Sequence, residues 1–86
     1  MRLKINISGN MTDINVYRLE YTTSKIAECY IDDICIIKNM TPTSCTIKFI
    51  GNDAKLNIDR LIKVHDRGDG YLHLETLRSE YIFKDI

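Results

Sequence analysis

Apolar and polar residues alternate along most of this chain, and this period of two constrains the fold more than any other feature. Successive side chains of a strand point to opposite faces, so the alternation is typical of half-buried β-strands. The pattern predicts strands over residues 2–8, 14–22, 46–50, 54–58, 61–64, 71–77 and 80–86. Within 14–22 the apolar positions change phase, which predicts a bulge or a change of face near Tyr17.

The segment 24–38 fits two structures. Ile26, Tyr30 and Ile34 recur at roughly helical spacing, and Ser24 can cap the start of a helix. The content of β-branched and aromatic residues favours a strand instead. We expect a strand, and the alternative of one helix around 24–38 would make the fold α+β.

Length and composition predict a single globular β domain over residues 1–86, with 44 % hydrophobic and 28 % charged residues. Six to eight short strands joined by short links are typical of a small antiparallel barrel or a two-sheet meander. A domain of this size buries only about 60 to 65 % of its unfolded surface, so its core is thin. Association into a homo-oligomer would add stability.

The charge balance disfavours nucleic acid as a partner. Twelve Lys and Arg residues offset twelve Asp and Glu residues, so the chain has no broad basic field. A nucleic-acid-binding barrel remains an alternative, in which tyrosines stack on bases. Its basic residues would be Arg2, Lys4, Lys48 and Lys63.

The cysteines Cys29, Cys35 and Cys45 lie in apolar or β-branched surroundings, at gaps of 6 and 10 residues that match no zinc-finger spacing. We expect reduced, buried thiols, no cofactor and no metal. No apolar run approaches the length of a membrane helix, and the first residues do not resemble a signal peptide. These observations predict a cytoplasmic protein without a membrane partner.

The candidate site lies around the sequence HDRGDG. If Val64 faces the core, the period of two places Lys63, His65, Tyr71, His73 and Glu75 on the opposite face. The two histidines can then lie about 5 Å apart directly, or about 7 to 8 Å apart diagonally, across a hairpin. A zinc site would need a third ligand, for which Glu75 is the one candidate nearby. The expected binding residues are Lys63, His65, Arg67, Tyr71, His73, Glu75 and Tyr30.

The tripeptide RGD at 67–69 is interpreted as turn chemistry. Asp66 and Asp69 are expected to accept hydrogen bonds from local amides, while Gly68 and Gly70 take positive φ.

The sequence contains no P-loop and no GxGxxG, HExxH or GxSxG motif, so we expect no catalysis. The predicted function is a non-catalytic binding module that acts through a protein interface or captures a small polar ligand. Small chains of this composition are often phage or mobile-element proteins that inhibit a host factor. A third hypothesis is a structural subunit of an oligomeric assembly.

Overall fold

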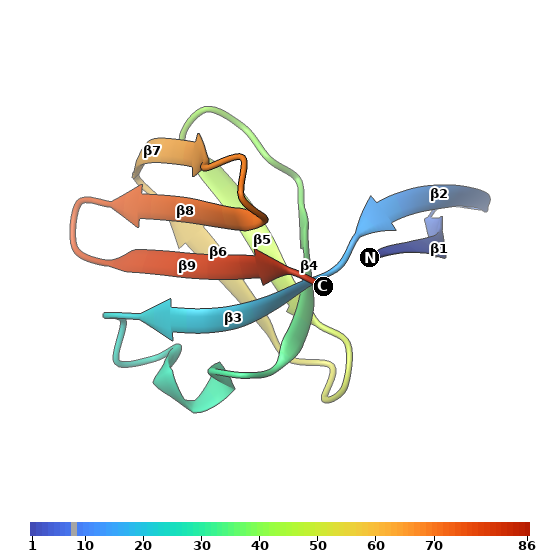
Figure 1. Cartoon of the computed structure of the whole chain (residues 1–86), viewed down its shortest axis with the longest axis horizontal. Coiled ribbons are helices and arrows are strands. Elements are labelled where there is room, and N and C mark those ends of the chain that lie inside the picture. The colour runs from blue at the N-terminus through green and yellow to red at the C-terminus, as the bar shows by residue number, and fades with distance from the viewer. Residues whose placement is uncertain (8) are drawn as a thin grey trace.

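The computed structural model describes residues 1–7 and 9–86, so Ser8, at the end of the first expected strand, lies outside the described residues. It confirms an all-β fold, with nine strands in two antiparallel sheets over these residues (Figure 1). The strands are β1 (Arg2–Ile7), β2 (Asn10–Asn15), β3 (Tyr17–Thr22), β4 (Ile34–Lys38), β5 (Ser44–Phe49), β6 (Lys55–Asp59), β7 (Leu61–Asp66), β8 (Tyr71–Thr76) and β9 (Glu80–Asp85).

Seven strands form one sheet in the order β6-β5-β4-β3-β9-β8-β7, which is open and not a closed barrel. Its edge strands β6 and β7 are consecutive in the chain, with only Arg60 between them at φ 58°. In Figure 1, β4, β5 and β6 lie behind β3, β9 and β8 and cross them obliquely. The sheet therefore folds over on itself as a meander with two facing halves.

The core lies between these halves, where the expected alternation holds. On β5, the side chains of Cys45, Ile47 and Phe49 are all buried. On β9, Tyr81 and Phe83 are buried in the same alternating way. Tyr81 and Phe83 have near-parallel rings, 6.4 Å apart. These two strands, from opposite halves of the sheet, supply much of the apolar layer that holds the fold together.

The expected strand 14–22 is two strands, which is why the count exceeds eight. β2 pairs with β1 in a separate hairpin, and β3 joins the large sheet after Val16, whose side chain is completely buried. The register irregularity lies between Leu19 and Tyr21, a few residues beyond the expected position. Burial of Val16 at the junction fixes the point where the chain leaves one sheet for the other.

The expectation for segment 24–38 is correct only for β4, and the alternative α-helix is wrong. Residues 25–32 form consecutive turns with one 3-10 turn, η1 (Glu28–Tyr30), and Asp32 takes a positive φ of 75°. Ala27 is completely buried, and Tyr30 packs against the core. Covering the core with these side chains outweighs the β propensity of the segment.

Candidate functional site

Antiparallel pairing places His65 of β7 directly opposite His73 of β8. Direct partners point to the same side of a sheet, so the pairs along β7, β8 and β9 define one face. This outer face comprises Lys63 and His65 of β7, Tyr71, His73 and Glu75 of β8, and Glu80, Ile82 and Lys84 of β9. The structure thus brings together the five residues that the sequence places on one face.

The other side of β7 is more exposed than the premise that Val64 faces the core implies. Val64 pairs with the buried Leu74, yet 47 % of its side-chain surface is exposed because β7 is an edge strand. Ile62 lies at a register irregularity and is 57 % exposed. Of the strand's residues, Leu61 alone is buried.

The turn between β7 and β8 confirms the predicted chemistry of HDRGDG. A carboxylate oxygen of Asp66 accepts a hydrogen bond from the Gly68 amide at 3.0 Å, and Asp69 accepts one from the Tyr71 amide at 3.2 Å. Gly68 and Gly70 adopt φ of 77° and 90°. The turn residues therefore hold the two strands in register.

Glu80 is the residue of this face that sequence reasoning missed. It begins β9 directly opposite Glu75 of β8. Its Oε2 lies 3.1 Å from Nε2 of His73, whose side chain is only 20 % exposed. One ligand atom from each of His73, Glu75 and Glu80 lies within 4.8 Å of the others. The atoms of these three side chains are therefore close enough to contact one small cation.

Four side chains form a continuous row across four strands of the sheet. Tyr21 of β3 pairs with Ile82 of β9, which pairs with His73, which in turn pairs with His65. Tyr21 is 45 % exposed at one end of the row. Apolar, aromatic and imidazole groups thus lie side by side on the outer face.

Positive charge gathers at one end of the outer face. The guanidinium of Arg67 lies 5.1 Å from the centre of the Tyr71 ring, and Nζ of Lys84 lies 5.6 Å from it. Both cations are within cation–π distance of that ring. Arg67 also pairs with Asp69 at 3.3 Å in the turn. The acidic residues Glu75 and Glu80 lie at the other end, together with Lys63, which is directly opposite Glu75.

Tyr30 is not part of this face. It ends η1, and its ring stacks on Phe49 of β5 with the centroids 4.5 Å apart. The expectation that Tyr30 lines the same surface as Tyr71 and His73 is wrong because its ring covers the core.

The cysteines differ from one another. Cys35 and Cys45 are buried as expected, and burial raises their thiol pKa to about 12 and about 11. The negative charge of Asp33 adds to the effect at Cys35. Cys29 is exposed, so the expectation of burial is wrong there, because it lies on the solvent side of the turns after β3.

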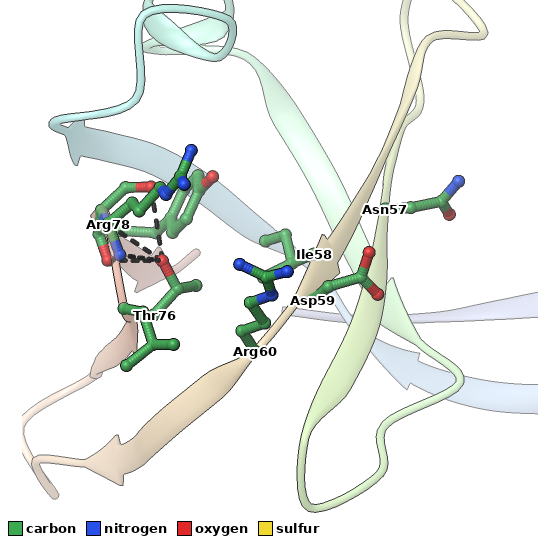
Figure 2. A pocket seen from close by; sticks show the side chains of 9 residues that line it. Asn57, Ile58, Asp59, Arg60, Thr76 and Arg78 are labelled. Carbon is green, nitrogen blue, oxygen red and sulfur yellow. Dashed lines mark hydrogen bonds between the residues drawn. The ribbon is translucent and has the colours of Figure 1, made fainter.

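Two of five surface hollows in the described chain are lined by outer-face residues, one by Glu75 and Glu80 and the other by Tyr71. A hollow of about 180 Å³ separates the end of β6 from the β8–β9 turn. Figure 2 shows the Arg60 side chain between Asp59 and that turn, with the Thr76 hydroxyl bonded within the turn. Neither His65 nor His73 lines any of the five hollows described. The outer face around the histidines is therefore a surface and not a cleft.

Within residues 1–7 and 9–86, no helix has the length and hydrophobicity needed to cross a lipid bilayer. Comparison of the chain with protein-family models, with curated proteins and with solved structures finds no match.

Proposed function

We propose that this protein is a non-catalytic binding module whose outer face binds a protein partner. The observation that carries the proposal is the row of Tyr21, Ile82, His73 and His65 across four strands. Side chains with an apolar body and a polar tip are favoured at protein interfaces. A shallow four-strand surface suits another protein better than a small polar ligand, which is usually enclosed in a cavity.

The charges on the outer face specify the partner's chemistry. Arg67 and Lys84 lie at the Tyr71 end, and Glu75 and Glu80 lie at the opposite end. A complementary surface carries an acidic group facing Arg67 and Lys84. The partner class we propose is a cytoplasmic host protein that a phage or mobile-element protein inhibits, a proposal supported by the small size and the lack of an enzyme motif.

Charge reversal on the outer face tests this proposal. A photo-crosslinking residue at position 65 is expected to capture one partner from a lysate of the source cells. Lys84→Glu should abolish that capture because it places like charge against the partner's acidic group. The matched control is Lys55→Glu on β6, an exposed lysine at the other edge of the sheet. Equal capture by both variants would contradict the proposal.

A structural subunit is the second candidate function, and the β1–β2 hairpin favours it. This hairpin forms a two-stranded sheet of its own and extends away from the body of the domain (Figure 1). Leu3 and Met11 on it are 37 % and 63 % exposed. Isolated two-stranded hairpins are marginally stable in water, so contact with a second copy would stabilise it. Native mass spectrometry tests this directly, since a monomer at micromolar concentration would exclude it.

The nucleic-acid alternative receives less support. Its four basic residues are divided among β1, β5 and β7: Leu3 of β1 and Lys48 line a common hollow, whereas Lys63 lies on the outer face of β7. Native mass spectra recorded at two salt concentrations separate nucleic-acid binding from protein binding, because phosphate binding weakens steeply between about 50 and 200 mM salt.

A further inference from the structure

We propose that the outer face also holds a site for one divalent transition-metal ion, with zinc as the best fit. The ligands are His73, Glu75 and Glu80, whose ligand atoms lie within 4.8 Å of one another. His65, directly opposite His73 on β7, is the candidate for a fourth ligand. The ion shares His65 and His73 with the row proposed to bind a protein partner, and its binding is tested on the isolated protein without that partner. The sequence identified the two histidines and Glu75 as candidate ligands, and the β8–β9 pairing adds a fourth, Glu80.

The hairpin of β8 and β9 places three ligands on one patch. His73 and Glu75 are two residues apart on β8, so they share a face. The turn at 77–78 returns the chain so that Glu80 lies directly opposite Glu75 and diagonal to His73. On the other side of β8, His65 lies directly opposite His73. Cross-strand neighbours of this kind have Cβ atoms about 5 Å apart, a separation that one metal ion can bridge.

The backbone of Glu80 is held by hydrogen bonds to the end of β3 and to the residue after it. Its carbonyl accepts hydrogen bonds from the Thr22 hydroxyl at 2.9 Å and from the Thr23 amide at 3.1 Å. Its amide donates to the Thr23 hydroxyl at 2.9 Å. The Thr76 hydroxyl orders the turn before it by accepting from the Ser79 amide. A ligand on such a rigid backbone loses little conformational freedom when it binds an ion.

The distance between two of the ligand atoms is close to that between ligands of tetrahedral zinc. Nε2 of His73 and Oε2 of Glu80 lie 3.1 Å apart. Ligand atoms about 2.0 to 2.1 Å from zinc in a tetrahedron are about 3.3 to 3.4 Å from each other. An ion can therefore replace the proton shared by this pair, and rotation of the Glu75 side chain brings in the third ligand.

The electrostatics of the patch also point to a cation. Glu75 and Glu80 are direct cross-strand partners, an arrangement in which two like charges repel. A divalent ion between them offsets that repulsion. Imidazole nitrogen together with carboxylate oxygen favours zinc, cobalt or nickel over magnesium and calcium, which prefer oxygen ligands alone.

The test is calorimetric titration of the full-length protein, stripped with a chelator, with Zn²⁺, and absorption spectroscopy with Co²⁺. We expect one ion per chain, a tetrahedral Co²⁺ spectrum and a rise in Tm with Zn²⁺. Loss of an outer-shell hydrogen-bond partner typically lowers metal affinity by roughly 10- to 100-fold. His73→Gln and Glu80→Gln each remove a direct ligand, so each should lower Zn²⁺ affinity by more than that. Their circular dichroism spectra without metal establish that they fold. Magnesium at the same concentration should have no effect.

Two controls isolate the site. Glu28→Gln changes an exposed carboxylate on η1, and Cys29→Ser removes the exposed thiol. Both should leave Zn²⁺ affinity unchanged.

Lys63→Ala removes a positive charge opposite Glu75 and should tighten binding by about two- to five-fold.

Three results would overturn the proposal. The first is the absence of Zn²⁺ binding, and the second is binding that survives both His73→Gln and Glu80→Gln. The third is binding that disappears with Cys29→Ser. An unchanged affinity in His65→Ala would remove His65 from the ligand set.

Discussion

The rings of Tyr30 and Phe49 stack at 4.5 Å between centroids, with an interplanar angle of 19°. Phe49 is completely buried on β5, whereas Tyr30 comes from the turns between β3 and β4. The contact therefore attaches an irregular segment to the sheet. It also explains why an aromatic residue that looked available for binding serves to cover the core.

Tyr30→Ala is expected to lower the free energy of unfolding by about 2 kcal/mol, because it removes a half-buried ring and its stacking contact with Phe49. Tyr30→Phe keeps the ring and should stay within about 0.5 kcal/mol of the wild type. Urea unfolding followed by circular dichroism measures both. An equal loss of stability in the two variants would assign the effect to the hydroxyl and contradict the stacking explanation.

Thiol labelling should distinguish the exposed cysteine from the buried ones. The thiolate is the reactive form, and burial holds the pKa of Cys35 near 12 and that of Cys45 near 11. At neutral pH, the folded protein should react with one equivalent of iodoacetamide, and the urea-unfolded protein with three. Cys29→Ser should remove the fast reaction, as mass spectrometry can show. Rapid modification of Cys35 in the folded protein would contradict its burial.

The same pKa values predict a loss of stability in alkali. The ordinary thiol pKa is 9.0, so between pH 9 and 11 the unfolded chain loses protons that the folded chain retains at Cys35 and Cys45. The free energy of unfolding therefore falls as pH rises, by up to about 1.4 kcal/mol per pH unit for each thiol.

Urea unfolding at pH 8, 9 and 10 measures this slope. Cys35→Ala should flatten it by about 1 kcal/mol per pH unit, whatever its effect on stability at pH 8. The exposed Cys29, changed to serine, is the matched control and should leave the slope unaltered. Parallel slopes in the wild type and Cys35→Ala would contradict the burial effect.

The alternation of apolar residues predicted most strands because it reports a local property. On β5, each inward residue between 45 and 49 is apolar or a thiol, and each outward one is polar. The exchange of sheets at Val16 and the turns around Ala27 follow from burial against distant strands. No local pattern carries that information, so the sequence predicted one strand over 14–22 and a regular element over 24–38.

The residues of the outer face were predictable from the sequence, but the register between β8 and β9 was not. If the strands spanned 71–77 and 80–86, a two-residue turn at 78–79 would join them. Residue 77 would then pair with Glu80, and residue 75 with residue 82. The observed register pairs Glu75 with Glu80. A shift of two residues keeps every side chain on its face and changes its neighbours. The shared face was therefore correct, whereas the contact between His73 and Glu80 was missed.

Arg60 links the two edge strands at φ 58°, in the left-handed region that favours glycine. Arg60→Gly should therefore raise the free energy of unfolding by about 0.5 to 1 kcal/mol, because glycine adopts this conformation without a Cβ clash. Asn57→Gly, made inside β6 where the backbone is extended, should lower it by a similar amount, about 0.5 to 1 kcal/mol. Urea unfolding of the two variants compares the effect of an introduced glycine at a left-handed position and at an extended position. A loss of stability in both would show that the Arg60 side chain contributes more through its packing beside the β8–β9 turn than its backbone conformation costs.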